Sequence, residues 1–254
     1  MPPEPVPQRS KGIIAMSLLH IRPARRSDCV DIARLVVMSS DGIAEYIWGP
    51  YVGGRTSLIA VGTRRSARDG VPFSYQNCLI AEVGSRIAGS LHAVAVPAPF
   101  EQDRANDPDP VLRQLLDFSD LGSLEIRGLA VYPAFRGQGA ATMLMSAAAE
   151  QARSRGLRRL SVVCFVANAA AIHFYRKFGF TVVNRAPSPA HPAFRHTGGE
   201  MLLLARPATL ADTGERLRRD DAVEDEGATD SGDAATLDAA AYRAEIALCP
   251  ALAP

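Results

Sequence analysis

The sequence predicts a mixed α/β domain, and three stretches carry this prediction. Residues 124–142 pass from an apolar run through a proline turn and a glycine pair into a helical pattern, which indicates a strand, a loop and a helix in succession. Residues 158–166 form a near-continuous apolar strand, and a helix bounded by Asn168 and Gly179 follows it. Residues 78–96 contain two apolar runs around a two-residue turn, which predicts a β-hairpin.

The first of these stretches indicates where its strand and its helix end. Pro133 cannot donate a hydrogen bond to a sheet, so the strand should end near Val131 or Tyr132. Helical spacing begins at Gln138 and ends near Gly156. The apolar face expected for this helix consists of Ala140, Met143, Leu144 and Ala147.

A loop with the sequence Arg-Gly-Gln-Gly-Ala-Ala, residues 136–141, lies between that strand and that helix. Glycine lets a ligand come close to the backbone, and the first N–H groups of a helix have no partner inside the helix. Together with the charge of Arg136 and the helix dipole, these groups suit the oxygens of a diphosphate. The loop lacks both the Walker pattern and the third glycine of a dinucleotide fingerprint. A tight turn without a ligand is the alternative for this loop taken alone.

Two motifs in this order resemble the GCN5-related N-acetyltransferase (GNAT) superfamily. They are R-x-x-G-x-A at residues 136–141, and Asn168 followed by A-I-H-F-Y-R-K-F-G-F at residues 171–180. The resemblance in motif covers residues 124–183, and the general layout covers residues 19–206. It implies the GNAT acyl-CoA N-acyltransferase fold, a central, mostly antiparallel sheet with one splayed pair of parallel strands, flanked by helices.

The resemblance also implies an activity, the transfer of an acetyl or small acyl group from acetyl-CoA to a primary amine. In this fold the strand ending at Val131 diverges from the strand 160–165, so its backbone groups are free to bind the pantetheine arm and the acetyl carbonyl. The pyrophosphate is expected on the loop N–H groups beside Arg136. Asn168 is expected at the pantetheine or the cofactor edge, and it is also an N-cap. The expected acetyl-CoA contacts are Leu129, Ala130, Val131, Arg136, Gly137, Gln138, Gly139, Ala140, Ala141, Thr142 and Asn168.

Two residues are candidates for catalysis by this resemblance. Tyr175 matches the tyrosine that in many family members protonates the departing thiolate, and a core tyrosine is the alternative. Glu125 is the candidate general base, acting directly or through water, since family members often place a carboxylate on this strand. By strand alternation Glu125 shares a face with Arg127, so an ion pair is the alternative unless a bulge near Gly128 changes the parity. Cys164 has no apparent histidine partner, which favours direct transfer in a ternary complex over an acyl-enzyme.

A second class of function stays open, a non-catalytic module that binds acyl-CoA as a sensor or interaction module. The presence of Tyr175 favours an enzyme, whereas the ion-pair alternative for Glu125 leaves the module in place. An ordinary nucleotide-binding α/β protein is a third interpretation, against which the missing Walker and dinucleotide motifs speak. The sequence does not distinguish a small-molecule amine from a protein acceptor, and it leaves a homodimer open.

The length and composition of the chain limit how many domains it can contain. Its 254 residues are 47% hydrophobic and carry a net charge of +1, which suits one catalytic domain with extensions. We expect a disordered lead at residues 1–17, the GNAT domain at residues 18–206 and an acidic, disordered tail at residues 207–254. The tail has eleven acidic and four basic residues, so the rest of the chain carries +8, which favours an anionic cofactor.

Several other sites and locations are not expected. No apolar run is long enough to span a membrane and the N-terminus does not resemble a signal peptide, so we expect a cytoplasmic protein. The basic segment 55–70 lacks interleaved aromatic residues, so we expect no nucleic-acid partner. His191 and His196 in the loop 184–200 are too few for a metal site. The four cysteines lack disulfide or zinc spacing. The thiols expected to be buried are those of Cys29, Cys78 and Cys164.

The remaining segments complete the expected layout. Asp28 is expected to open the first helix, because aspartate is a good N-cap. Residues 44–48 suggest a short helix, in which Trp48 either lines the acceptor site, as the resemblance implies, or packs on the sheet. Residues 55–70 are expected to be irregular. The other expected elements are a strand at 18–22, a helix at 110–118, and strands at 180–183 and 201–205.

Overall fold

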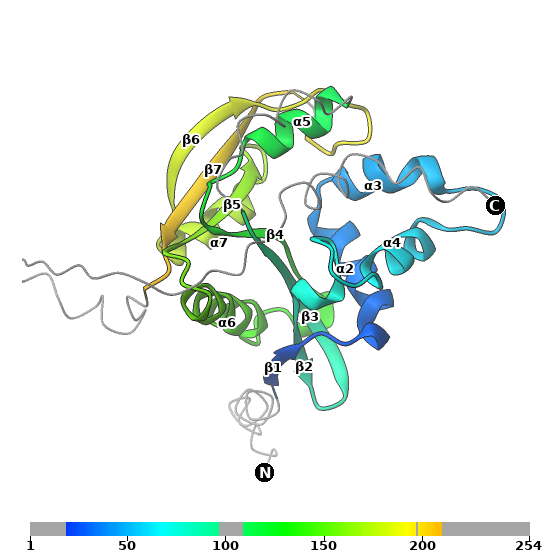
Figure 1. Cartoon of the computed structure of the whole chain (residues 1–254), viewed down its shortest axis with the longest axis horizontal. Coiled ribbons are helices and arrows are strands. Elements are labelled where there is room, and N and C mark those ends of the chain that lie inside the picture. Colours follow the sequence, from blue (N-terminus) through cyan, green and yellow to red (C-terminus); the bar gives the residue numbers. More distant parts are fainter. Residues whose placement is uncertain (1–18, 97–108, 197, 210–254) are drawn as a thin grey trace, which may run out of the picture. The chain divides into compact units, whose positions relative to one another are not determined.

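The structure is a computed structural model (Figure 1). It describes residues 19–96, 109–196 and 198–209. The expected lead at residues 1–17 lies outside the described residues, as does nearly all of the expected tail at residues 207–254. The domain limits of 18 and 206 therefore stay a prediction.

The described residues form two compact units. The first contains the described residues up to His92 together with Gly128–Ala148. The second contains the described residues of Ala93–Arg127 and those from Ala149 onward. The helices and strands, in chain order, are β1 (Leu19–Pro23), α2 (Cys29–Ser39), α3 (Ile43–Trp48), α4 (Leu58–Ser66), β2 (Cys78–Val83), β3 (Arg86–Ala95), α5 (Pro110–Asp117), β4 (Leu124–Val131), α6 (Ala140–Ser154), β5 (Arg159–Phe165), α7 (Ala169–Lys177), β6 (Thr181–Pro187) and β7 (Glu200–Pro207).

Among the described residues, seven strands are joined by hydrogen bonds in the order β1-β2-β3-β4-β5-β7-β6. The pairs β1–β2, β2–β3, β5–β7 and β6–β7 are antiparallel, whereas β4 and β5 are parallel. Within the second unit, Figure 1 shows β5, β7 and β6 side by side. This topology confirms the predicted mixed α/β fold with a mostly antiparallel sheet, and the β2–β3 pair confirms the predicted hairpin.

The register of the parallel pair covers only part of each strand. The register of β4 and β5 contains three pairs, the last of which joins Ile126 and Val162. Both strands continue past that point, β4 to Val131 and β5 to Phe165. The later residues of β4 therefore lie in a strand whose register with β5 has ended, as the predicted splayed pair requires.

Segment 55–70, which we expected to be irregular, contains helix α4, so that prediction was wrong. The helix has an N-cap, because Ser57 Oγ accepts a hydrogen bond from Ala60 N–H at 3.2 Å. Trp48 is 3% exposed and packs against this helix. A Cβ added at Gly62 would lie 2.3 Å from Cζ3 of Trp48, so the glycine makes room for the indole ring. Trp48 is thus buried against helices, whereas the packing alternative had placed it on the sheet.

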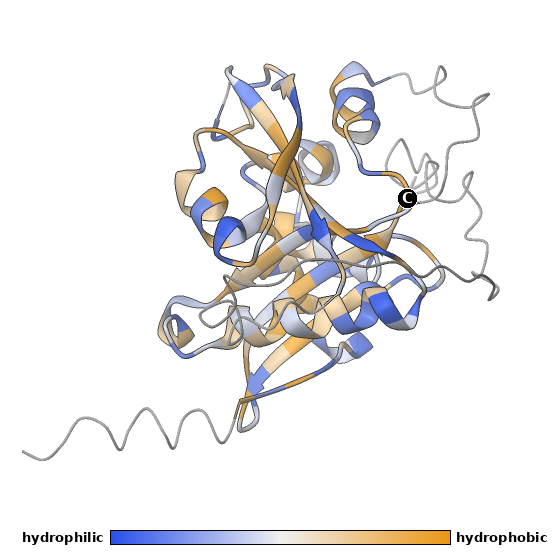
Figure 2. Cartoon of the chain, turned by 90° about the vertical axis from the view of Figure 1, so that its left-hand side faces the viewer, coloured by the Kyte–Doolittle hydropathy of each residue, from blue (hydrophilic) through white to orange (hydrophobic). Residues whose placement is uncertain are grey.

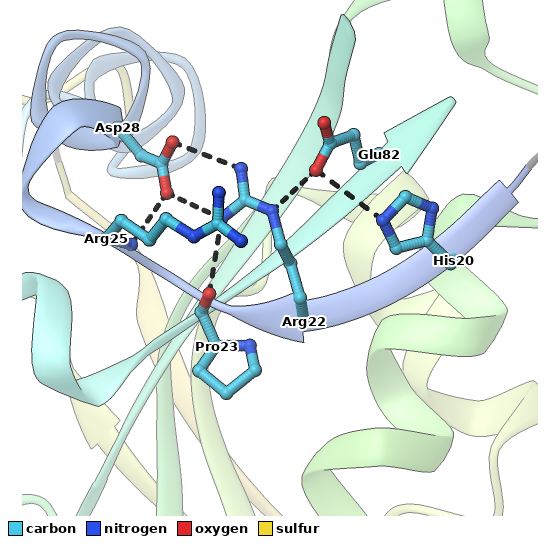
Figure 3. A network of polar contacts seen from close by, with 6 residues as sticks. All are labelled: His20, Arg22, Pro23, Arg25, Asp28 and Glu82. Atoms are coloured by element: carbon cyan, nitrogen blue, oxygen red, sulfur yellow. Dashed lines mark hydrogen bonds and ion pairs between the residues drawn. The ribbon is translucent and has the colours of Figure 1, made fainter. Parts of the chain in front are cut away.

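Asp28 occupies the N-cap position of α2, but its side chain makes no capping hydrogen bond to that helix. Its carboxylate instead accepts hydrogen bonds from Arg22, with Nη1–Oδ2 at 2.7 Å and Nη2–Oδ1 at 3.1 Å (Figure 3). It also accepts one from Arg25 N–H at 2.7 Å. Arg22 Nε donates to Glu82 on β2. Because all three charged side chains are largely buried, this network joins β1, β2 and the start of α2.

Replacing Asp28 by Asn should lower the free energy of unfolding by about 3 kcal/mol, because the buried guanidinium of Arg22 loses a charged partner. Burial raises the pKa of Asp28, but the hydrogen bonds from Arg22 and from Arg25 N–H outweigh it, so the folded-state pKa is lowered. Such a carboxyl contributes stability above its unfolded pKa of about 4 and loses it as the pH falls through the folded pKa. The difference between wild type and variant in denaturant unfolding should therefore shrink from pH 7 to pH 3.

Asp69 offers a matched control for that experiment. It pairs with Arg26, but both side chains are more than half exposed. Asp69→Asn should therefore cost less than about 1 kcal/mol. An equal loss for Asp28→Asn and Asp69→Asn, or a loss that does not change with pH, would contradict the role given to the buried network.

Hydrophobic residues run along the strands of the sheet (Figure 2). In β7 the five residues from Met201 to Ala205 are all buried, as expected for a strand covered on both faces. The three predicted thiols, those of Cys29, Cys78 and Cys164, are buried, and none of them forms a disulfide within the described residues.

The buried face of α6 differs from the predicted one. Met143, expected to be buried, is 36% exposed. The helix is rich in alanine on every side, so hydrophobic spacing alone does not define which face is covered. The buried residues of α6 are Ala140, Leu144, Met145, Ala148, Ala149 and Ala152.

Candidate active site

The end of β4 is held close to β3 within the first unit. Tyr132 N–H donates a hydrogen bond to the carbonyl of Ala88 at 2.8 Å. A Cβ at Gly89 would lie only 2.5 Å from the carbonyl oxygen of Ala130, so this approach requires glycine. Residues 129–131, the expected contacts of the pantetheine arm and the acetyl group, are therefore fixed along their β3 edge.

The loop after β4 adopts a conformation that its glycines make possible. Gly137 and Gly139 have φ angles of 74° and 87°, in the left-handed region. No atom lies within 4 Å of a Cβ added at either position, so the glycines serve the backbone conformation and the space beside them is open. Arg136 Nε donates to the carbonyl of Val131 at 3.1 Å, which holds this arginine at the end of β4.

Helix α6 follows this loop directly. Met143 N–H donates to the carbonyl of Gly139 at 3.0 Å, which is the usual spacing of an α-helix. The N–H groups of residues 140–142, at the start of α6, precede this bond and have no carbonyl of an earlier helical turn to bond. Their number, the open space at the two glycines and the nearby guanidinium fit a diphosphate.

Helix α7 has the boundaries that the sequence predicts. Asn168 Oδ1 accepts a hydrogen bond from Ala171 N–H at 3.1 Å, which confirms Asn168 as the N-cap. The helix ends at Lys177, and Gly179 has a φ angle of 79°, as a C-terminal glycine requires.

Tyr175 is 6% exposed and is surrounded by aromatic rings. Its ring centroid lies 5.4 Å from that of Phe174 and 5.4 Å from that of Phe180, both in edge-to-face geometry. Burial raises the pKa of Tyr175, and the neighbouring Cys164 raises it further. The phenol therefore stays protonated and can donate a hydrogen bond.

Glu125 is 1% exposed, and it forms the ion pair that strand alternation suggests. Its Oε1 lies 2.8 Å from Arg127 Nε. Its Oε2 is buried and has no hydrogen-bond partner among the described residues. Burial raises the pKa of Glu125, Arg127 and Ser119 partly offset that rise, and Asp120 adds to it. The result is a buried carboxyl with a raised pKa and one unused oxygen.

The loop between β6 and β7 packs on itself and on the end of β5. His191 Nδ1 accepts a hydrogen bond from Ala193 N–H at 3.1 Å, and the ring of His196 lies 6.0 Å from that of Phe165. Within the described ranges, no three or more His, Cys, Asp and Glu side chains gather where they could hold a metal ion. None of the helices in the described part of the chain is both long and apolar enough to cross a membrane.

Comparison with known families agrees with this geometry. Residues 59–180 match the model of the Acetyltransferase (GNAT) family, a range that holds β4, the glycine loop and α7. These residues carry the sequence features of the GNAT superfamily. A Bacillus subtilis protein described as an uncharacterized N-acetyltransferase is 36% identical over 59 residues, which are 23% of this chain and 38% of that protein. The match thus spans less than half of that relative's length.

Solved structures share the GNAT fold with this chain. An N-acetyltransferase from Staphylococcus aureus Mu50 is similar with a TM-score of 0.52 and 22% identity, over 72% of this chain and 99% of that one. An agmatine N-acetyltransferase variant is similar with a TM-score of 0.53 and 16% identity, over 75% of this chain and 99% of that one. At these identities the likeness concerns the fold.

The GNAT domain distributes the predicted site residues over its two units. The expected contacts from Leu129 to Thr142 lie in the first unit, where strand end, loop and helix start form one continuous segment. Glu125, Asn168 and Tyr175 lie in the second unit. The roles assigned to all of these residues stay predictions.

One contact at the end of β4 was not expected from the sequence of this GNAT domain. Tyr132 Oη donates a hydrogen bond to Asp31 Oδ1 on α2 at 2.6 Å. The two residues are 101 positions apart, and no local pattern connects them. The one available signal is the place of Tyr132 between the strand and Pro133.

Proposed function

We propose that this GNAT domain transfers an acetyl or small acyl group from acetyl-CoA to a primary amine. The observation that carries the proposal is segment 129–142. In it, a strand end beyond the β4–β5 register leads into a loop with two left-handed glycines and then into the start of α6. This succession offers backbone groups to a long ligand that has amides at one end and a diphosphate at the other.

The binding of acetyl-CoA would use the backbone of this segment along its whole length. The amides of the pantetheine arm can pair with residues 129–131 as an added strand pairs with a sheet edge. The diphosphate would lie on the N–H groups of residues 137–142, each contributing about 0.3–1 kcal/mol, and up to about 2 kcal/mol where partly buried. Arg136 would add a charge-assisted contact.

The reaction itself needs a neutral amine and a polarised thioester. The amine nitrogen attacks the thioester carbon, a C–N bond forms, and the carbonyl oxygen takes the electron pair as an oxyanion. Backbone N–H groups of residues 129–131 are suited to stabilise that oxyanion, an interaction worth about 3–4 kcal/mol in such sites. The C–S bond then breaks, CoA leaves as a thiolate, and the nitrogen loses a proton.

Glu125 would accept the proton of the amine, directly or through water. The raised pKa of its buried carboxyl moves this group toward the pH at which a general base works best. The ion pair with Arg127 opposes that rise, so in this proposal the pair tunes the base and need not replace it.

Tyr175 would direct its hydroxyl group at the departing sulfur. A thiol has a pKa of about 8.5 and a free phenol one of about 10, so full transfer costs at least about 2 kcal/mol. Because burial raises the pKa of Tyr175 further, we propose that it stabilises the thiolate chiefly through a hydrogen bond.

Binding of CoA to the glycine loop can be tested with two matched variants. Gly139→Ala introduces a side chain at a φ of 87° in the loop, and Gly84→Ala does so at a φ of 63° in the β2–β3 turn. Both should cost about 1 kcal/mol of stability or somewhat more. By calorimetric titration, Gly139→Ala should bind CoA at least about tenfold more weakly than wild type, whereas Gly84→Ala should bind it like wild type.

Equal CoA affinity of the two variants would contradict a diphosphate site at this loop. Tight CoA binding by wild type without turnover on any amine would favour the alternative, a module that binds acyl-CoA without catalysis. That alternative shares the loop but gives Glu125 and Tyr175 no chemical role.

A further inference from the structure

We propose that the hydrogen bond between Tyr132 and Asp31 is a positioning contact, which holds the end of β4 in place for acyl-CoA. The inference rests on the proposed function, because it concerns the segment that would bind the donor. Neither residue would touch the reacting atoms. All residues that carry the inference lie in the first unit.

One face of α2 meets the second half of β4 at two places. Asp31, Leu35 and Ser39 are four residues apart and therefore share a face of the helix. At one end of this face, Asp31 Oδ1 accepts the hydrogen bond of Tyr132 at 2.6 Å. At the other end, a Cβ added to Gly128 would lie 3.0 Å from Ser39 Oγ. Between them, Leu35 is 1% exposed.

The spacing of these contacts fits a helix lying along a strand. Eight residue steps of α-helix, from Asp31 to Ser39, span about 12 Å. Four residue steps of extended chain, from Gly128 in β4 to Tyr132 just after it, span about 13 Å. The two segments therefore match in length, and α2 runs opposite in direction to β4. The two contacts lie on either side of residues 129–131, whose backbone is proposed to bind the pantetheine arm.

Tyr132 occupies the junction between that strand end and the loop. Its backbone N–H is bonded to Ala88 on β3, and its side chain is bonded to Asp31 on α2. The next residues lead to Arg136, whose Nε returns to the carbonyl of Val131. Because burial, and then the bond to Asp31, raise the pKa of Tyr132, its hydroxyl keeps its proton and remains the donor. The side-chain bond is thus the tie that fixes the junction to a helix as well as to the sheet.

Loss of this tie should affect the donor more than the acceptor. A junction free to shift would present residues 129–131 and the loop N–H groups in less favourable positions. We expect Tyr132→Phe to raise the dissociation constant of CoA and the KM for acetyl-CoA about tenfold. The KM for the amine should change less than twofold, and kcat less than about threefold.

The partner residue allows a test of the bond itself. Asp31→Asn keeps an oxygen acceptor for the Tyr132 hydroxyl and should bind CoA within about threefold of wild type. Asp31→Ala removes the acceptor and should resemble Tyr132→Phe. The double variant, Tyr132→Phe with Asp31→Ala, should be no weaker than either single variant, because both remove the same bond.

The same unit provides a control with the same chemistry at another place. Tyr75 Oη donates to Asp69 Oδ1 at 2.9 Å, a bond to which no residue of β4 contributes. Tyr75→Phe should leave CoA affinity unchanged. Amide hydrogen exchange of residues 129–131, measured without ligand, should speed up in Tyr132→Phe but not in Tyr75→Phe. A merely structural loss of stability would not separate the two variants in this way.

The outcomes are distinct. If wild type binds CoA and Tyr132→Phe binds it within twofold, the positioning role is wrong while the proposed function stands. If Asp31→Asn loses as much affinity as Asp31→Ala, the charge matters and the hydrogen bond does not, which also overturns the inference. If wild type itself fails to bind CoA, the proposed function fails and the positioning role fails with it.

Discussion

Replacing Glu125 by Gln should lower kcat about a hundredfold or more, the size expected when a general base is removed. Gln has nearly the same shape, so the buried site keeps its packing, but its amide cannot take a proton from the amine. CoA affinity should stay within about twofold, since Glu125 is not among the proposed contacts of the donor. The measurement is steady-state release of CoA thiol, with CoA titration as the check on binding.

The pH dependence of turnover tests the same assignment. A base must be deprotonated to act, so kcat/KM should rise as the pH passes through the pKa of Glu125. Burial raises that pKa, so the acid limb should lie above the usual carboxyl value of about 4.3. Arg127 lowers it, so Arg127→Met should move the limb to higher pH, while Arg127→Lys, which keeps the charge, should move it less. If the acid limb lies at the same pH in wild type and in both Arg127 variants, Glu125 is only the partner of an ion pair.

Replacing Tyr175 by Phe should also lower kcat about a hundredfold, because the departing thiolate loses its hydrogen-bond donor. Phe keeps the ring between Phe174 and Phe180, so thermal stability and CoA affinity should change little. Since the pKa of Tyr175 is raised, the wild-type enzyme should show no loss of activity from ionisation of this phenol below about pH 10.

Acetyl donors with different leaving thiols can distinguish a catalytic role of Tyr175 from a purely structural one. An acetyl thioester of a more acidic thiol needs less help on departure, so Tyr175→Phe should be much less impaired with it than with acetyl-CoA. Tyr75→Phe, which also removes one phenol hydroxyl, should be unimpaired with both donors. A defect of equal size with both donors would assign Tyr175 to the core alone.

Local sequence predicted those parts of the fold whose signals lie within a few residues of each other. Asn168 and Gly179 mark the ends of α7 because capping acts over one helical turn. Helix α4 was missed because glycine is unfavourable in a helix by itself. The structure shows why Gly62 is there: a larger residue would collide with the ring of Trp48. The exposed Met143 was assigned to the buried face because α6 has alanines on all of its sides. Only tertiary packing decides which side of such a helix is covered.

In the candidate site, too, local features were predictable from the sequence and contacts between distant segments were not. The glycine loop was predictable, since two glycines close together indicate a backbone conformation that other residues rarely adopt. The positive φ angles of Gly137 and Gly139 agree with this prediction. Contacts between distant segments were not, since the partners of Tyr132 and of Arg22 lie 101 and up to 60 positions away. Strand alternation did bring Glu125 and Arg127 together, but it could not give the burial that raises the pKa of Glu125.

The most direct test of acetyl transfer is the release of CoA thiol from acetyl-CoA across a panel of small amines, polyamines and peptides, with wild type, Glu125→Gln and Tyr175→Phe compared after each is shown to bind CoA. We expect turnover with one class of amine in the wild type and a loss of about a hundredfold in each variant. Tight CoA binding without turnover on any acceptor would contradict the proposed enzymatic activity. Turnover that both variants retain would contradict the chemical roles given to Glu125 and Tyr175.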